Sequence, residues 1–347
     1  MADALADPQP PGLDPRRLVR LMAAAVERCR LDLTGLRVLT EAANGAYVVT
    51  PVLAAMAGAR VDALGAGTSY ASAAELERVT LELADLAGVA DRVTVHDRPD
   101  PTLLGAVDVV TNSGQVRPID AAMVAQLKPT CVVPLMYEAW EYRASDVDLA
   151  ACRARGVAVA GTNEQHPAVD VFSFLGPMAV KALHDAGVSV YASTLALLCD
   201  NAFGPYIERT LTACGARVTT TARLSADSLP PGCDAVVVAL QPGDDVVLTA
   251  ADAARLADLS PGTPLVQYWG DVDRAGLAAA GVPTWPRHEP GRGHMAVLPS
   301  AVGPEPIVRL QSGGLKVGEV LARGLPNATP DDLAFLQALD DGTTGVS

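Results

Sequence analysis

The chain has 347 residues, of which 50% are hydrophobic and only 4% aromatic, and its formal net charge is -14 at pH 7. The length predicts two domains, because a single hydrophobic core rarely grows so large. The 40 acidic against 26 basic residues have the wrong sign for neutralising phosphates, which excludes a nucleic acid as the partner.

The beginning of the chain is acidic and proline-rich, without a basic segment followed by an apolar run. Nowhere do about 18 uncharged apolar residues follow one another, as a membrane-spanning helix requires. We therefore expect a soluble, cytoplasmic protein that does not bind membranes. The six cysteines lie far apart, with no C-x-x-C pair and no cluster at zinc-ligand spacing. They are expected to be small buried hydrophobes, and no metal site is predicted.

Short apolar runs alternate with helical apolar spacing over the first half of the chain. Strands are predicted at residues 36–40, 60–64, 93–96, 107–111, 131–136 and 157–160. Helices are predicted at residues 16–30, 48–57, 74–86, 119–127 and 147–155. Strands separated by helices of this length need crossover connections, which predicts a mostly parallel sheet.

An apolar helix over residues 167–186 is expected to connect this unit to a second one. The second unit has predicted strands at 195–199, 218–221, 235–240 and 264–268, and predicted helices at 205–213, 250–257 and 274–280. The connector helix has more apolar positions than one packed face needs, which predicts a homodimer. The expected domains are a leader and helix (1–30), a first Rossmann-like domain with the connector (31–185), a second (186–325) and a frayed acidic tail (326–347).

Two segments of the chain resemble each other. Glu41–Tyr47 and Asp200–Tyr206 share an acid, an Ala, a Gly and a Tyr at the same offsets, and the sequence G-A-R-V follows both, at Gly58 and Gly215. These matches in the same order predict an internal duplication. The expected fold is α/β, with two tandem doubly wound Rossmann-like domains.

The turn after the first strand of a Rossmann unit normally carries a G-x-G-x-x-G sequence that holds a pyrophosphate. In the second unit Cys199, Asn201 and Gly204 occupy those three positions, so only the last glycine is present. The Asp200 carboxylate would repel a pyrophosphate that it faced.

The end of the second strand of this unit usually carries an acid for the ribose hydroxyls, but here it carries Thr221, Arg223 and Ser225. A basic side chain beside two hydroxyl groups favours binding of a 2'-phosphate, and hence NADP over NAD. Alternatively, Arg223 is only a charged surface residue. We expect this unit to be the nucleotide site, with the Glu41–Tyr47 turn as the next candidate. The predicted cofactor-binding residues are Asp200, Asn201, Gly204, Thr221, Arg223 and Ser225.

The stretch from 108 to 180 resembles the catalytic-domain half of the D-2-hydroxyacid dehydrogenases. It has a helix ending in Leu127-Lys-Pro129, a D-x-D at Asp146–Asp148, and an R-G-V-x-V segment that ends in Gly161-Thr-Asn163. The second unit is similar to the nucleotide-binding domain of that family. The resemblance implies an NAD(P)-dependent oxidoreductase that acts on a small polar metabolite in a cleft between the domains.

Two residues depart from the pattern of that family. Trp269 stands where the family has the Arg that fixes the substrate carboxylate, and Gln311 stands near the place of its proton-transferring His. The usual chemistry of 2-hydroxy acids is therefore not implied. Either the chemistry was rebuilt or the protein does something else.

Replacement groups follow the predicted strands, where open α/β sheets place their ligands. The loop after the fifth strand supplies Tyr137, Glu138, Trp140 and Arg143, although it is equally readable as a solvated loop. The predicted substrate-binding residues are Asn112, Gln115, Trp140, Arg143, Asn163 and Trp269.

Imidazole groups suit acid–base chemistry near neutral pH, and the glycine-rich segment 285–295 contains two of them. Each of these histidines also reads as an exposed loop residue. His288, Glu289 and His294 lack further ligands for a metal. The predicted catalytic residues are Tyr137, Glu138, His166, His288 and His294.

Two other functions stay open. An acid beside the first-strand turn, as at Glu41 or Asp200, is tolerated when the ligand is positively charged, which favours a group-transfer enzyme that uses S-adenosylmethionine. A duplicated scaffold that has lost its cofactor would serve as a non-catalytic binding protein.

Overall fold

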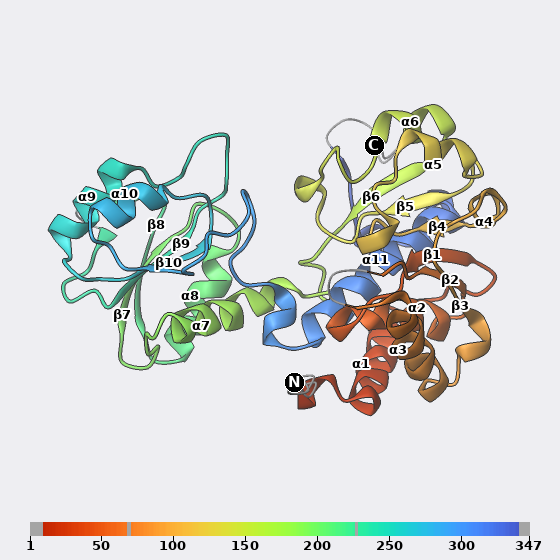
Figure 1. The fold of residues 1–347 in the computed structure, drawn as a ribbon, viewed down its shortest axis with the longest axis horizontal. Coiled ribbons are helices and arrows are strands. Elements are labelled where there is room, and N and C mark those ends of the chain that lie inside the picture. Colours follow the sequence, from red (N-terminus) through yellow and green to blue (C-terminus); the bar gives the residue numbers. More distant parts are fainter. Residues whose placement is uncertain (1–9, 68–70, 226–227, 340–347) are drawn as a thin grey trace, which may run out of the picture. The chain divides into compact units, whose positions relative to one another are not determined.

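The computed structural model describes residues 10–67, 71–225 and 228–339. The chain forms two compact units (Figure 1). Unit 1 consists of the chain up to Val171 together with the chain from Gly303 onward, and unit 2 runs from Phe172 to Val302. The predicted α/β fold with two mostly parallel sheets is confirmed.

Unit 1 has a seven-stranded sheet in the order β12-β6-β5-β4-β1-β2-β3. Its strands are β1 (Arg37–Glu41), β2 (Arg60–Leu64), β3 (Val93–His96), β4 (Val109–Val110), β5 (Val132–Pro134), β6 (Ala158–Thr162) and β12 (Leu336–Gln337). All neighbours pair in parallel except β12, which is antiparallel to β6. Without β12, the order is the 3-2-1-4-5-6 of classical Rossmann domains.

Helices cover both faces of this sheet. They are α1 (Pro15–Arg28), α2 (Val49–Met56), α3 (Ala73–Leu86), α4 (Pro101–Ala106), α5 (Ala121–Gln126), α6 (Leu149–Arg155), α11 (Glu305–Arg323) and the short α12 (Pro330–Leu333). Successive strand residues point to opposite faces. Val38 and Val132 pack with α1, α2 and α11, whereas Leu39 and Val133 pack with α4, α5 and α6.

Helix α11 is the central helix of unit 1, and every side chain from 311 to 321 is buried. Glycines let it lie directly against the sheet. A Cβ on Gly318 would stand 2.8 Å from Cγ1 of Val109, and a Cβ on Gly314 would stand 2.4 Å from Sδ of Met136. The close fit explains how a helix with so few large side chains can fill the centre of a core.

Unit 2 has a parallel five-stranded sheet in the order β11-β10-β9-β7-β8. Its strands are β7 (Thr194–Leu198), β8 (Arg217–Thr221), β9 (Ala235–Ala239), β10 (Leu265–Trp269) and β11 (Thr284–Trp285). Its helices are α7 (Leu175–Asp185), α8 (Gly204–Ala213), α9 (Ala250–Leu259) and α10 (Arg274–Ala279). Residues of α7 and α8 share one apolar core, and residues of α9 and α10 share the other.

Three features differ from the prediction. The connector helix does not begin at 167, because Asp170 has a positive φ of 49° and the α-helix starts only at Leu175. Helix α11, which the sequence reading missed, returns the chain to unit 1, so the units divide at Val171 and Gly303 and not at 185 and 325. The expected frayed tail contains α12 and β12, while its last residues, 340–347, lie outside the described residues.

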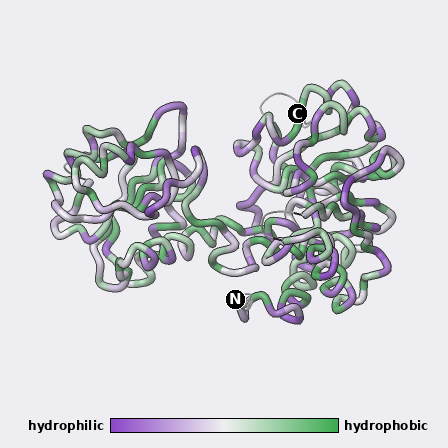
Figure 2. Tube along the Cα trace, viewed as in Figure 1, coloured by the Kyte–Doolittle hydropathy of each residue, from purple (hydrophilic) through white to green (hydrophobic). Residues whose placement is uncertain are grey.

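The hydropathy of the residues follows this layering (Figure 2). The strands of each unit are mostly hydrophobic, and many of the connecting loops are hydrophilic. The apolar residues of α7, including Leu175, Met178 and Leu183, are buried within unit 2. The apolar positions that led to the predicted homodimer are thus buried in the core of unit 2. The homodimer stays a prediction. Within the described residues, no helix is both long and apolar enough to cross a membrane.

Candidate functional site

Four neighbouring strands of unit 1 end in polar residues at the carboxyl edge of the sheet. We call Glu41, Asn112, Gln115, Glu138, Asn163, Glu164 and His166, which follow or end β1, β4, β5 and β6, the polar edge. The sequence reading had selected five of these seven as catalytic or substrate-binding residues. The carboxyl ends of parallel strands are where open α/β sheets bind ligands.

Glu41 bridges the switch point between β1 and β4. Its buried carboxyl group accepts a hydrogen bond from the backbone N–H of Gln115. Gly114 makes room for it, because a Cβ there would lie 1.5 Å from Oε2 of Glu41. Burial raises the pKa of Glu41, while the charge of Arg117 and the Gln115 amide oppose that rise.

Asn112 has one unpaired polar group in the interior. Its Oδ1 accepts a hydrogen bond of 2.7 Å from the backbone N–H of Met136, which ties the ends of β4 and β5 together. Its Nδ2 is buried without a hydrogen-bond partner within the described part of the chain, although the side chain is only 2% exposed. An unpaired buried donor is unfavourable unless a ligand or water completes it.

Glu138 is buried and held by three donors. Its Oε2 accepts a 2.5 Å hydrogen bond from Nε1 of Trp140, its Oε1 accepts one of 2.9 Å from Nε2 of Gln337, and the backbone N–H of Glu164 donates to it as well. Burial nevertheless raises the pKa of Glu138. The pKa of Glu164 is raised further, by burial and by the nearby charges of Glu141 and Glu138. A carboxyl group such as that of Glu164 can hold a proton near neutral pH and act as a general acid.

His166 is buried against the C-terminal segment. Its ring stacks on Phe335 with 3.7 Å between the ring centroids, its Nδ1 accepts from the backbone N–H of Ala168, and its Nε2 lies 3.8 Å from Asp331. Burial lowers the pKa of His166, although Asp331 opposes this. Asn163 is held in the same segment, where its side chain donates to the backbone oxygen of Ala334.

Tyr137 is hydrogen-bonded within the protein, and its catalytic role stays a prediction. Its hydroxyl donates to Asp146 at 3.1 Å, and Arg117 binds the same carboxylate at 2.9 Å. Burial, with the charge of Asp146, raises the pKa of Tyr137, so the phenol stays protonated. The other two residues of this loop, Trp140 and Arg143, are exposed, and their role in binding a substrate stays a prediction.

The unit 2 turn differs from a pyrophosphate site. Asn201 Oδ1 accepts from the backbone N–H of Phe203, its Nδ2 donates to the backbone oxygen of Ala239, and its own backbone oxygen accepts from the N–H of Gly204. The next residue is proline, which has no N–H. The first amides of α8 are therefore occupied within the protein. The Asp200 carboxylate accepts a hydrogen bond from the backbone N–H of Gln241. A role of Asp200 and Asn201 in cofactor binding stays a prediction.

The end of β8 leaves the other predicted cofactor residues near the surface. Thr221 Oγ1 donates to the backbone oxygen of Arg223, the Arg223 side chain is exposed, and the backbone N–H of Ser225 donates to Ser228. Their role in binding a 2'-phosphate stays a prediction.

Trp269 is a core residue of unit 2. It is 4% exposed, its ring stacks on Phe203 at 4.8 Å, and its Nε1 donates to the backbone oxygen of Gly293. Substrate contact through Trp269, as predicted, does not agree with this burial. His288 and His294 are exposed in the following loop, and within the described residues no three His, Cys, Asp or Glu side chains are placed to hold a metal.

Gln337 and Glu164 are not among the site residues predicted from the sequence. Gln337 lies in the segment expected to be frayed, and no local pattern connects it to Glu138, 199 positions earlier. Glu164 was noticed only as part of a polar run after β6. Its position directly after a buried strand was the available signal.

No family model and no curated protein matches the sequence. Among solved structures, a dipicolinate synthase component from Bacillus subtilis is 14% identical, with 86% of this chain and 98% of that chain covered and a TM-score of 0.54. The corresponding dipicolinate synthase component from Bacillus halodurans is 15% identical, with 86% and 100% covered and a TM-score of 0.51. An NAD-dependent formate dehydrogenase from Staphylococcus aureus, solved in complex with NAD, is 12% identical, with 82% and 94% covered and a TM-score of 0.45.

Identities this low establish the fold and not the activity. The two-domain α/β fold that the sequence resemblance implied is confirmed at that level. The chain is therefore a divergent protein with the two-domain α/β fold of the dipicolinate synthase components.

Proposed function

We propose that the protein is an NAD(P)-dependent oxidoreductase acting on a small polar metabolite, and that the dinucleotide lies across the carboxyl edge of the unit 1 sheet. The strand order of unit 1 carries this proposal. The order β3-β2-β1-β4-β5-β6 is that of dinucleotide-binding domains, which hold their ligand at the switch point between the first and fourth strands. This proposal places the nucleotide on the Glu41–Tyr47 turn of unit 1, the second candidate of the sequence prediction, and not on unit 2.

The backbone of that turn supports the choice of unit 1. Gly45 has a φ of 59°, and no atom of the described residues lies within 4 Å of the place where its Cβ would stand. Within the described residues, the N–H groups of Gly45 and Ala46 donate to no acceptor. Open space over a glycine and unpaired amides are what a pyrophosphate needs. The turn of unit 2 offers neither, because Asn201 occupies its amides.

Glu41 is compatible with a nearby phosphate. A buried carboxyl group with a raised pKa loses its charge more readily than an exposed one, and this group is already bonded to the Gln115 amide. Glu41 therefore repels an anionic ligand less than a fully ionised glutamate would.

The other half of the polar edge supplies groups that handle protons. When bound, the cofactor provides the hydride transfer. The hydroxyl proton of an oxidised alcohol must then pass to a base. His166, whose pKa is lowered by burial, follows β6 on the side of the switch point opposite to β2 and β3, and its neutral imidazole can take such a proton. Exposed Arg143 is the candidate for an anionic group on the metabolite.

The experiment is a titration of the purified protein with NADH and NADPH, followed by nicotinamide fluorescence. A Gly45→Ala variant should bind about tenfold more weakly or worse, because the methyl group occupies the space over the turn. Gly88→Ala is the matched control, since Gly88 also has a positive φ and open space but lies after α3. Failure of the folded wild-type protein to bind either dinucleotide would reject the proposal.

The acid at the end of β1 favours a second candidate, an enzyme that uses the positively charged S-adenosylmethionine. Glu41 lies at the switch point, where an acid suits a cationic ligand. Calorimetry with this compound separates the two candidates. Saturable binding heat with S-adenosylmethionine, without dinucleotide binding, supports the second candidate. Absence of binding for all of these ligands supports a non-catalytic scaffold.

A further inference from the structure

The C-terminal segment Thr329–Leu339, which we call the strap, crosses the polar edge. Phe335 is 2% exposed and stacks on His166, and Leu336 and Gln337 extend the sheet by pairing with Thr162 and Gly161 of β6. The strap thus contacts the loops that follow β5 and β6.

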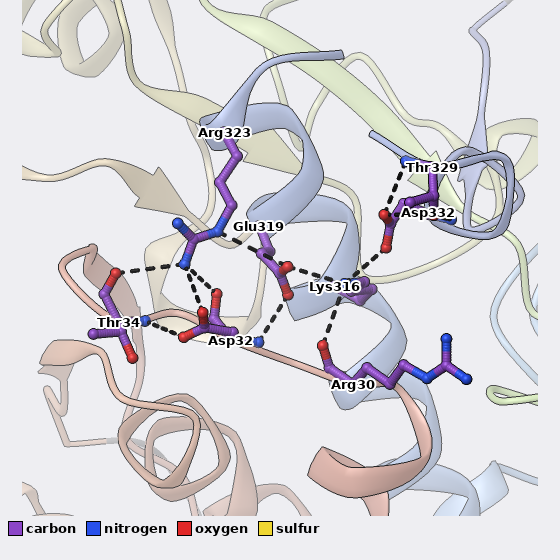
Figure 3. Close-up of polar contacts among 8 residues, drawn as sticks. All are labelled: Arg30, Asp32, Thr34, Lys316, Glu319, Arg323, Thr329 and Asp332. Atoms are coloured by element: carbon purple, nitrogen blue, oxygen red, sulfur yellow. Dashed lines mark hydrogen bonds and ion pairs between the residues drawn. The ribbon is translucent and has the colours of Figure 1, made fainter. Parts of the chain in front are cut away.

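A buried lysine anchors the start of the strap (Figure 3). Lys316 of α11 is 4% exposed, and its Nζ lies 2.9 Å from both Asp332 of the strap and Glu319 of its own helix. It also donates to the backbone oxygen of Arg30 at 3.3 Å. Attachment at Asp332 does not depend on Gln337, so the residues from 335 onward can be altered without releasing the whole strap.

The Gln337 side chain meets a matched pair of groups. Its Oε1 accepts a 2.8 Å hydrogen bond from the backbone N–H of Ala139, and its Nε2 donates 2.9 Å to Oε1 of Glu138. One donor and one acceptor, side by side, thus satisfy the oxygen and the NH₂ of a single carboxamide.

This pair is built by residues other than Gln337. The absence of a side chain at Gly161 lets the loop approach β6, since a Cβ there would lie 2.6 Å from the Ala139 nitrogen. Trp140 Nε1 and the Glu164 amide fix the Glu138 carboxylate from other directions. The donor and acceptor are therefore held in place without Gln337.

We propose that Glu138 and the Ala139 amide form a binding site for a primary carboxamide, and that Gln337 occupies it as an internal competitor. A carboxylate ligand would lack the NH₂ group and would be repelled by Glu138, whereas a primary amide satisfies both partners. The nicotinamide ring carries such a group, and this identification of the ligand rests on the proposed function. In the proposed orientation the nicotinamide half lies over β4 to β6, where this site is found.

Free nicotinamide and nicotinate are the probes, with dissociation constants measured by ligand-observed NMR on the full chain. Gln337→Ala removes the competitor and should bind nicotinamide about tenfold more tightly than the wild type, while binding of nicotinate stays unchanged. Gln126→Ala, which removes an exposed amide of α5, is the matched control and should behave as the wild type. The double variant Glu138→Ala/Gln337→Ala should not show the tighter binding of nicotinamide that Gln337→Ala alone shows.

Equal affinity of wild type and Gln337→Ala for nicotinamide would overturn the proposal, as would equal gains for nicotinamide and nicotinate. If Gln337→Ala does not fold, Gln337→Glu serves instead, because a second carboxylate facing Glu138 is repelled from the site without loss of volume. Free nicotinamide needs no pyrophosphate turn. Retained NADH binding without any effect at position 337 therefore rejects this site alone, and a nicotinamide gain without dinucleotide binding rejects only the proposed function.

Discussion

The carboxylate of Asp200 accepts a 2.9 Å hydrogen bond from the backbone N–H of Gln241, across the switch point between β7 and β9. Glu41 of unit 1 does the same with the backbone N–H of Gln115, across the switch point between β1 and β4. The acid shared by the two similar sequence segments thus has one structural role in both units, although the duplication itself stays a prediction. In unit 2, Asn201 adds a second link between these strands, because its Nδ2 donates to the backbone oxygen of Ala239.

Arg223→Ala distinguishes the two units as the dinucleotide site. If the dinucleotide lies on unit 1, this variant should bind NADPH and NADH with wild-type affinity, because exposed Arg223 belongs to unit 2. Fluorescence titration measures both constants. A loss of about tenfold for NADPH alone would instead place a 2'-phosphate on Arg223, as the sequence had suggested.

Glu41→Gln should make stability less dependent on pH. Burial raises the pKa of Glu41 in the folded state, so the folded protein binds the proton more tightly than the unfolded chain. The free energy of unfolding contributed by this group therefore falls as the pH rises from about the unfolded value toward the folded one. Glutamine keeps an acceptor for the Gln115 amide but has no proton to lose. Urea unfolding at pH 5 and pH 8 should show that the free energy of unfolding of the variant, relative to that of the wild type, is higher at pH 8 than at pH 5. The exposed control Glu77→Gln should show no such difference.

Gly318→Ala should destabilise the protein by about 1–2 kcal/mol, because the new methyl group overpacks the contact between α11 and Val109. The sign opposes the usual helical preference for Ala over Gly. Gly105→Ala in α4 is the matched control, because within the described residues its Cβ would meet only the Gln126 oxygen, at 3.9 Å. Thermal unfolding of both variants should shift in opposite directions, and stabilisation by Gly318→Ala would show that α11 has room to move.

Lys316→Met should cost about 3 kcal/mol, because Glu319 and Asp332 lose their buried partner. Lys181→Met removes an exposed pair with Asp185 and should cost less than about 1 kcal/mol. Partial burial raises the pKa of Asp332, but hydrogen bonds from Lys316 and Thr329 outweigh it and lower the pKa to about 2. This stabilisation is present above the unfolded pKa and is lost as the pH falls toward 2, so acid denaturation of the variant should lack that component. Similar losses for both lysine variants would contradict a buried network.

Local patterns were sufficient to predict most of the fold. The alternation of apolar runs and helical spacing predicted β1, β2 and β3 and the helices between them nearly at their observed bounds, because each element buries residues close in sequence. Polar residues that follow strands also predicted most of the polar edge, since parallel strands end at one edge. Asn112, Glu138 and His166 were found in this way.

Long-range contacts could not be predicted by the same means. Gly313, Gly314 and Gly318 make α11 look like a poor helix, and only its burial against strands far away in sequence stabilises it. Trp269 looked like a substitute for a substrate-binding arginine, but whether it faces a ligand or Phe203 depends on packing that the sequence does not display.

The late position of α11 in the sequence constrains how the chain can be synthesised. Translation delivers the chain from its N-terminus, so the first 171 residues emerge without α11, and the part of the sheet face that α11 covers stays exposed while all of unit 2 is being made. Unit 2 has its whole core as soon as Val302 has emerged, whereas unit 1 must wait for α11. The nascent protein therefore completes its second unit first. During that interval the face awaiting α11 is where a chaperone would bind and where aggregation would begin.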